Sequence, residues 1–131
     1  MQNPIEFELD SLVDLYNYNQ WIADSFYPFA KGSIMEIGAG IGTLSAYMTT
    51  VSDHLTLVEP SPVLFEKLKT KFALDENVTP IQNTIETLLD VTNGQTFDAI
   101  VMSNVLEHIK DDRAALKILS DLLRPGGYLL L

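Results

Sequence analysis

Apolar residues along the chain form two patterns that follow each other in turn from about residue 33 onward. Short continuous apolar runs are typical of strands buried on both faces, and apolar residues at steps of three and four are typical of helices with one buried face. The runs predict strands at residues 33–37, 55–59, 78–82, 97–103 and 128–131. Strands that alternate with helices indicate an α/β fold with a parallel sheet.

The helical pattern is clearest before the first strand and after the fourth. A helix is expected from about Asp10 to Phe26 or Tyr27, because Pro28 disfavours helical backbone just before it. Its predicted apolar face consists of Leu12, Leu15, Tyr18, Ile22 and Phe26. Further helices are expected at residues 43–50, after Ser61-Pro62, at residues 85–89, and after Asp111 or Asp112, the last with a buried face of Ala115, Leu119, Leu122 and Leu123.

A glycine-rich segment joins the first predicted strand to the next helix. Gly38, Gly40 and Gly42 recur at every second position, which suits a tight turn and close approach of a ligand to the backbone. A dinucleotide site requires a third glycine in the pattern G-x-G-x-x-G, and that position is Thr43 or Ser45 here. The spacing therefore disfavours a nicotinamide dinucleotide.

An acidic residue ends the second predicted strand. Glu59 lies 19 residues after Gly40. A carboxylate at this point of such a fold can accept hydrogen bonds from two ribose hydroxyls, and its charge disfavours a 2′-phosphate. Glu59 is therefore a candidate for binding a nucleoside sugar.

Several motifs occur in the order found in one enzyme family. They are Glu36-Ile37-Gly38-Ala39-Gly40-Ile41-Gly42, Val58-Glu59-Pro60, Gln82-Asn83-Thr84-Ile85-Glu86, the segment 97–108 and Leu122-Leu123-Arg124-Pro125-Gly126-Gly127. Together they resemble the class I, Rossmann-like methyltransferases over about residues 33–131. The resemblance implies a mostly parallel sheet of about five strands in the order 3-2-1-4-5, with helices on both faces and strands six and seven missing. It also implies a helical cap segment at residues 1–30 and an S-adenosylmethionine-binding domain at residues 31–131.

The resemblance assigns roles to particular residues. Glu36 would orient the loop or meet the methionine amino group, Glu59 would bind the ribose hydroxyls, and Asn104 would line the methionine end. Thr84 and Ile85 would flank adenine, although many relatives have an aspartate at or near position 84. The full implied set for S-adenosylmethionine is Glu36, Gly38, Ala39, Gly40, Gly42, Glu59, Pro60, Asn83, Thr84, Ile85, Asn104 and Leu106.

His108 is the candidate catalytic residue, since a histidine beside the ligand-binding edge can take a proton from a nucleophile. The alternative is that Glu107 and His108 only shape their loop. Some small-RNA methyltransferases hold a divalent ion with a Glu-x-x-Glu-His arrangement. The first position of that arrangement is Asn104 here, which is a poorer ligand, so no metal site is predicted. Tyr16, Tyr18 and Trp21 form a lid over the cofactor or simply pack on the sheet.

Composition narrows the classes of partner. The net charge of −10 opposes extended nucleic-acid binding, and Lys67, Lys69 and Lys71 are expected to form a solvated helix face. The absence of cysteine excludes disulfides and thiolate metal sites. No apolar run is long enough to span a membrane and no secretory signal is recognised, so a cytoplasmic location is expected. The exposed edge at residues 128–131 predicts a fragment, a dimer or a covering second domain.

These observations favour a methyltransferase that acts on a small-molecule acceptor. One alternative is a non-catalytic module or fragment that binds S-adenosylmethionine or S-adenosylhomocysteine. A less favoured alternative is an NAD-dependent oxidoreductase, against which the missing third glycine argues.

Overall fold

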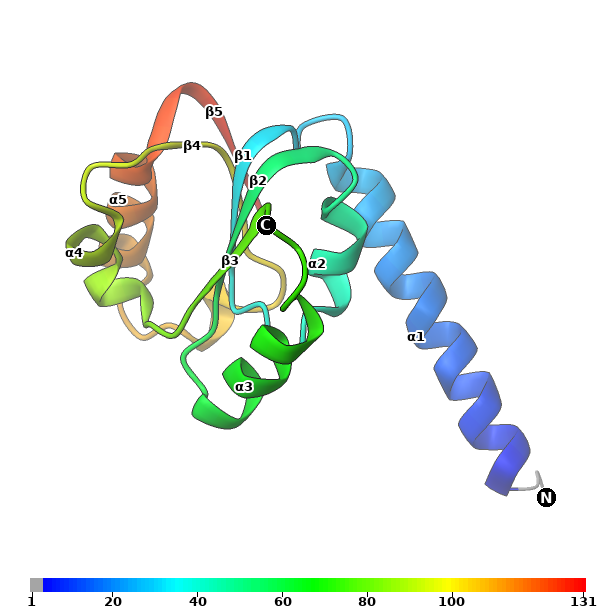
Figure 1. The fold of residues 1–131 in the computed structure, drawn as a ribbon. Helices are drawn as coiled ribbons and strands as arrows, with labels where there is room; N and C mark the ends of the chain where they lie inside the picture. The colour runs from blue at the N-terminus through cyan, green and yellow to red at the C-terminus, as the bar shows by residue number, and fades with distance from the viewer. Residues whose placement is uncertain (1–3) are drawn as a thin grey trace.

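A single sheet of parallel strands forms the centre of the computed structural model, which describes residues 4–131 and the side chains from residue 15 onward (Figure 1). The strand order is β3-β2-β1-β4-β5, with every neighbouring pair parallel. The strands are β1 (Gly32–Ile37), β2 (Ser52–Val58), β3 (Val78–Ile81), β4 (Phe97–Val101) and β5 (Leu123–Leu130). The predicted α/β class and the order 3-2-1-4-5 are confirmed.

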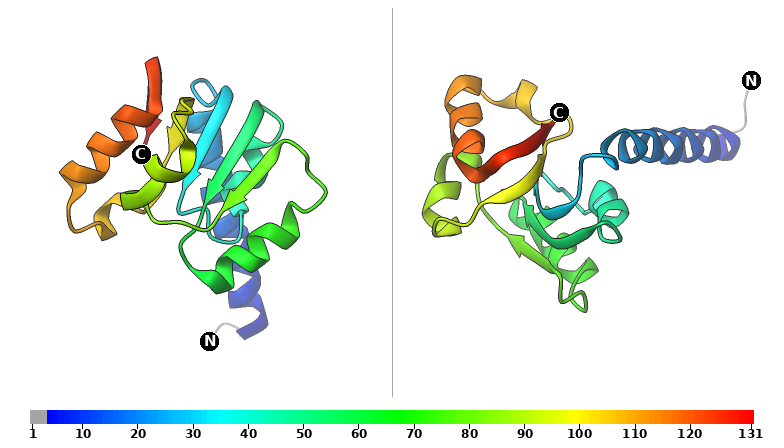
Figure 2. Two further views of the ribbon diagram at one scale, coloured as in Figure 1. Left: turned by 60° about the vertical axis from the view of Figure 1, so that its left-hand side comes forward. Right: turned by 90° about the horizontal axis from the view of Figure 1, so that it is seen from above.

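Helices cover both faces of this sheet, as predicted. The helices are α1 (Pro4–Phe26), α2 (Thr43–Met48), α3 (Pro62–Lys71), α4 (Leu88–Thr92) and α5 (Asp112–Leu122), with short 3-10 turns η1 (Ile85–Thr87) and η2 (Leu106–His108). Helices α1, α2 and α3 lie on one side, and α4 and α5 lie on the other (Figures 1 and 2). Within residues 4–131 no helix combines the length and the apolar character required to cross a membrane.

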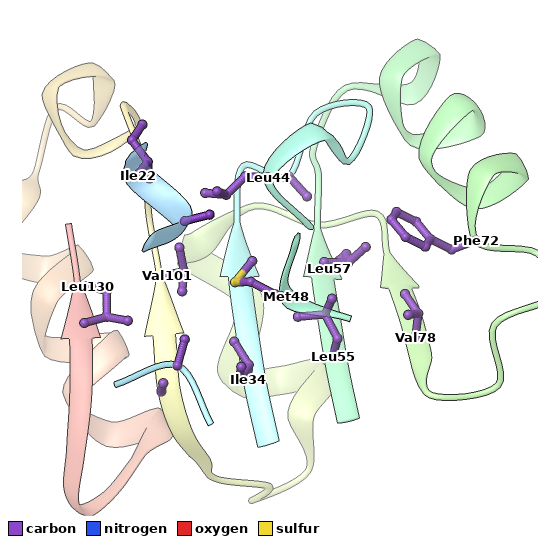
Figure 3. Close-up of a cluster of buried hydrophobic side chains, with 14 of the residues drawn as sticks. Ile22, Ile34, Leu44, Met48, Leu55, Leu57, Phe72, Val78, Val101 and Leu130 are labelled. Carbon is purple, nitrogen blue, oxygen red and sulfur yellow. The ribbon is translucent and has the colours of Figure 1, made fainter. Parts of the chain in front are cut away.

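Two apolar cores result from the alternation of side chains along the strands. Ile34 belongs to the core under α1, α2 and α3, whereas its neighbour Met35 belongs to the core under α4 and α5. Figure 3 shows the first core, where Leu55 and Leu57 of β2 pack with Met48 of α2. Burying each such side chain stabilises the fold by about 1.5–3 kcal/mol.

The long first helix differs from its prediction in two respects. It begins at Pro4 rather than near Asp10. Its predicted apolar face is only partly buried, because Ile22 lies in the core while Leu15 and Tyr18 are 55% and 43% exposed. Leu12 lies outside the residues whose side chains are described. Only the last turns of α1 pack on the domain, and its N-terminal part projects away from the sheet (Figure 2).

The last strand also differs from its prediction. It begins at Leu123 rather than Tyr128, so Leu123 does not belong to the buried face of α5. Leu123 pairs with Phe97, and an irregularity in the register follows before Tyr128 pairs with Ala99. The Pro125-Gly126-Gly127 turn therefore interrupts a longer strand instead of preceding a short one.

Candidate functional site

The glycine loop at residues 38–42 connects β1 to α2 and is fixed to the end of β2. The amides of Gly38 and Ala39 donate to the carbonyl oxygen of Val58 at 2.8 and 3.0 Å. The Gly42 amide donates to the Ala39 carbonyl oxygen at 2.9 Å and closes the turn. The backbone of the loop is therefore held at the carboxyl edge of the sheet, where ligands bind in folds of this kind.

Gly40 and Gly42 have the same backbone requirement but different surroundings. Both have positive φ, +59° and +86°, which glycine adopts without strain. A Cβ on Gly40 would meet no atom within 4 Å, whereas a Cβ on Gly42 would lie 2.5 Å from Cε2 of Phe72. Gly42 is thus required by packing against α3, and Gly40 leaves open space that a ligand can fill.

Glu59 follows β2 directly and contacts the loop. Its Oε2 accepts a hydrogen bond from the Gly40 amide at 3.0 Å, and its Oε1 accepts one from the Ser61 amide at 3.3 Å. Its side chain is largely buried. Each carboxylate oxygen has capacity for a further hydrogen bond, so Glu59 can accept from a diol without leaving the loop.

Glu36 lies beneath the loop, on the face of β1 that α2 covers. It is buried, and the Ser45 hydroxyl of α2 donates to its Oε2. The pKa of Glu36 is raised to about 7, chiefly by burial. The Ser45 hydrogen bond and the charge of Lys71 oppose this rise, and the charge of Glu59 adds to it. Its contact with Ser45 fits the predicted role of orienting the loop.

Lys71 is a loop contact that sequence reasoning missed. Its Nζ donates to the carbonyl oxygen of Gly42 at 3.0 Å and thereby joins the end of α3 to the glycine loop. Lys69 pairs instead with Glu66 on the same helix. All three lysines are exposed, as expected, but Lys71 has this additional bond. The helical pattern gave no signal for it because the contact depends on tertiary structure.

A cavity of about 320 Å³ lies beside the loop at the ends of β1, β2 and β3. We call it the loop cavity. It is lined by Ile37, Gly38, Val58, Glu59, Pro60, Asn83, Thr84, Ile85, Glu86, Val105, His108 and Ile109. Its walls are mainly apolar, with a few polar groups, which is typical of small-molecule sites.

Seven of the predicted site residues line this cavity: Gly38, Glu59, Pro60, Asn83, Thr84, Ile85 and His108. Five do not. Glu36 and Ala39 are buried, and Gly40 and Gly42 belong to the adjoining loop. Leu106 packs against the core on the α5 side.

The prediction also missed part of the cavity wall. Val105 and Ile109 flank η2, and their apolar side chains give no signal that separates a cavity wall from a core. Glu86 was noted only as part of a motif. Ile37 and Val58 end buried strands and reach the cavity because the strands stop there.

Asn83 has a structural task in addition to its place on the cavity wall. Its Oδ1 accepts hydrogen bonds from the Thr84 amide, at 2.7 Å, and from the Thr87 hydroxyl. Asn83 therefore connects the residues before and at the end of η1, Thr84 and Thr87, through one oxygen atom. Its carbonyl oxygen is already engaged, which leaves its amide nitrogen for a ligand.

His108 stands at the rim of the loop cavity. Its side chain is 77% exposed, and its Nε2 lies 4.0 Å from Oε1 of Glu107. His54 lies elsewhere, in β2, with its Nε2 at 3.0 Å from the Thr79 hydroxyl. Over the part of the chain that the structure describes, no three acidic or histidine side chains gather closely enough to hold a metal ion.

Asn104 lines a second cavity, of about 220 Å³, between α1 and the end of β4. We call it the α1 cavity. Asn104 has a left-handed backbone with φ of 57°, and its Nδ2 donates to the hydroxyl of Tyr18 at 3.3 Å. Trp21 and Leu131 contribute apolar walls. Asn104 and Val105 are consecutive, so one short segment borders both cavities.

The profile of the family described as "Methyltransferase domain" matches residues 35–129, which span the whole sheet from β1 into β5. The chain belongs to the class I S-adenosylmethionine-dependent methyltransferases. This assignment agrees with the resemblance seen in the motifs and decides against the NAD-dependent oxidoreductase.

Curated relatives carry methyltransferase names. The ubiquinone biosynthesis O-methyltransferase of Xanthomonas oryzae is 30% identical over 104 residues, which cover 78% of this chain and 43% of that protein. An uncharacterized methyltransferase of Mycobacterium tuberculosis is 30% identical over 108 residues, which cover 82% of this chain and 53% of that protein. The chain thus spans about half the length of the curated relatives it matches.

The fold of this chain is also found in solved structures. DhpI in its complex with SAH superposes with a TM-score of 0.74 at 23% identity, over 93% of this chain and 60% of that one. At this level of identity the likeness concerns the fold.

The residues at the loop edge suit the cofactor of this family. The open space at Gly40 is a cradle that a side chain would fill. In the loop cavity Glu59 would hold the ribose diol through its carboxylate, and Pro60 and Ile85 would present apolar surface to the adenine ring. The mainly apolar walls around them suit a nucleoside part.

Proposed function

We propose that this protein transfers a methyl group from S-adenosylmethionine to a small-molecule acceptor. In this proposal the adenosine part lies in the loop cavity and the methionine part runs along Gly40 towards Asn104. Bound S-adenosylmethionine supplies an electrophilic methyl group. The residues of the chain position the nucleophile and exclude water, which is the main requirement of a displacement at an activated carbon.

Glu59 carries this proposal, because it joins the two parts of the site. It contacts the glycine loop through the Gly40 amide and lines the cavity where a ribose would lie. A carboxylate in this place suits a nucleoside with two free ribose hydroxyls.

The substitution Glu59→Ala tests it. We expect the affinity for S-adenosylhomocysteine to fall by about 1–3 kcal/mol, the range for hydrogen bonds to a charged group. Titration calorimetry measures this change, with exposed Glu66→Ala as the matched control. Equal affinity in Glu59→Ala and the unchanged chain would remove the site assignment.

A non-catalytic binding module is the second candidate. The observation in its favour is that His108, the candidate base, is 77% exposed and stands only at the rim of the loop cavity. Incubation with S-[methyl-³H]adenosylmethionine and a panel of acceptors separates the two candidates. Labelled product supports the transferase, and tight cofactor binding without labelled product from any acceptor supports the module.

In the proposed methyl transfer, His108 accepts the proton of the nucleophile. Its support is its place at the rim of the loop cavity, where an imidazole can exchange protons with solvent. A base role requires the nucleophile of the acceptor to reach this rim.

A further inference from the structure

Two asparagines have a left-handed backbone in the part of the chain that the structure describes. Asn93 has φ of 52° and Asn104 has φ of 57°. This backbone is unfavourable for any residue with a side chain, although asparagine tolerates it better than most. Asn93 ends α4, where a left-handed residue commonly closes a helix. Asn104 follows the strand β4 instead, and a left-handed residue at the ligand-binding edge of a sheet calls for a different explanation.

Val105, the next residue, lies where Asn104 turns the chain. Its side chain lines the loop cavity and packs against the core under α4 and α5. A Cβ on Gly38 would lie 2.5 Å from Cγ2 of Val105, so the valine occupies the space that a side chain on Gly38 would need. The Gly38 amide is itself bonded to Val58 at the end of β2. Val105 therefore connects the end of β4 to the first glycine of the loop.

The side chain of Asn104 faces the other cavity. It lines the α1 cavity, and its amide nitrogen donates to the hydroxyl of Tyr18 at 3.3 Å and to that of Ser103 at 3.4 Å. Both distances are long for hydrogen bonds and the residue is exposed, so these contacts hold the segment only weakly. Asn104 is not among the described residues that line the loop cavity. It is connected to that cavity by its backbone, through Val105.

We propose that Asn104 is a positioning residue of the cofactor site and that it acts through its backbone. Its left-handed conformation holds Val105 against Gly38 and thereby fixes the wall of the loop cavity beside the glycine loop. This inference rests on the proposed function, because it takes the loop cavity as the place of the adenosine part. It requires no contact between the Asn104 side chain and the ligand.

Asn104→Ala and Asn104→Gly separate the backbone from the side chain, because both remove the amide group. Glycine adopts a positive φ without strain, whereas alanine favours a right-handed or extended backbone. In the free alanine variant the segment would relax and move Val105 away from Gly38, and ligand binding would have to restore it. We expect Asn104→Ala to weaken S-adenosylhomocysteine binding about tenfold in titration calorimetry, and Asn104→Gly to recover the affinity to within about twofold of the unchanged chain.

Asn93→Ala is the matched control, because it removes the same amide group and strains the same kind of backbone. Asn93 precedes β4 and Asn104 follows it, so the two lie at opposite ends of one strand. Asn93 is not among the described lining residues of either cavity. We expect both alanine variants to lower the midpoint of thermal unfolding, and S-adenosylhomocysteine affinity to fall only in Asn104→Ala.

Val105→Ala tests whether Asn104 acts through its neighbour. The alanine lacks the methyl groups that meet Gly38, so the conformation of Asn104 no longer places them. We expect Val105→Ala alone to weaken S-adenosylhomocysteine binding. Adding Asn104→Ala to it should then cost less than about twofold, compared with about tenfold in the unchanged chain, because residues that act as one unit are not additive.

Three results would overturn the inference. They are an equal loss of affinity in Asn104→Gly and Asn104→Ala, a loss in Asn93→Ala as large as in Asn104→Ala, and additive effects of Asn104→Ala and Val105→Ala. If Asn104→Ala fails to fold, the glycine variant still decides, since a tenfold loss there would show that the side chain acts. Failure of the unchanged chain to bind S-adenosylhomocysteine would overturn the proposed function, whereas normal binding by that chain with any of the three results overturns only this inference.

Discussion

Glu36 and Glu59 lie on either side of the glycine loop, and their partners distinguish them. Glu59 accepts hydrogen bonds from two backbone amides, whereas the hydrogen bond to Glu36 comes from the Ser45 hydroxyl. Burial without a directly bonded cation favours the protonated form of Glu36. The two acids are therefore suited to different tasks, one to hold the loop and one to bind a sugar.

The protonation of Glu36 makes stability depend on pH. Its pKa is about 7 in the folded chain and about 4.5 in a model peptide. Between these values the unfolded chain releases the proton first, so the free energy of unfolding falls as pH rises, by about 3 kcal/mol for this group. Below about pH 4.5 this contribution is fully present, and above about pH 7 it is lost.

Glu36→Gln removes this titration. We expect the free energy of unfolding of the unchanged chain, relative to the variant, to fall between pH 4.5 and 7. Urea unfolding at several pH values measures the difference, with exposed Glu76→Gln as the control for loss of one carboxylate. A difference that stays constant with pH would contradict a proton held by Glu36.

Substitutions at Gly40 and Gly42 are expected to have different effects, one on ligand binding and the other on stability. Gly40→Ala has the same strain of positive φ but places its methyl group in open space, so we expect the chain to fold and S-adenosylhomocysteine binding to weaken. Gly42→Ala forces a methyl group against Phe72 and Leu68 and is expected to reduce stability by more than the about 1–2 kcal/mol that positive φ alone costs. Thermal unfolding and calorimetry on both variants separate the effects. Equal loss of stability in the two would contradict this division.

At the scale of elements, α3 controls the position of the glycine loop. Phe72, which follows α3, packs where Gly42 lacks a side chain, and Lys71 bonds to the carbonyl oxygen of the same glycine. The end of a helix that contributes no residue to the loop cavity thus determines the shape of its border.

Lys71→Met tests this connection, because methionine keeps the apolar stem and removes the donor. We expect S-adenosylhomocysteine affinity to fall by about 0.5–1.5 kcal/mol, the usual net value of one hydrogen bond. Lys67→Met, on the exposed face of the same helix, is the control and should bind normally. Titration calorimetry compares the two, and equal affinities would show that the loop needs no such bond.

For the whole molecule, the sheet order and the cofactor edge follow from sequence because both depend on local patterns. Buried strands appear as apolar runs, and the glycine spacing marks the turn after β1. The exposed part of α1 and the start of β5 at Leu123 were not predictable from these patterns. Periodicity shows which residues can face a core, but the packing of the whole chain decides which of them do.

In the site, too, local sequence patterns do not show contacts that depend on the packing of the whole chain. Glu59 and Gly40 were predicted from their spacing, since the chemistry of a ribose and a tight turn restricts residue type. Lys71, Val105 and the α1 cavity were missed as site features because they arise from elements far apart in sequence. Asn104 was identified, but its contact with Tyr18 required the fold.

Trp21 gives the molecule an intrinsic optical probe. It is the single tryptophan of the chain, and it lies on the wall of the α1 cavity with its ring partly open to solvent. The emission maximum and quenching of its fluorescence therefore report events in this one cavity without an attached dye. Occupancy of the α1 cavity can be followed in real time, while ligands confined to the loop cavity should leave the signal nearly constant.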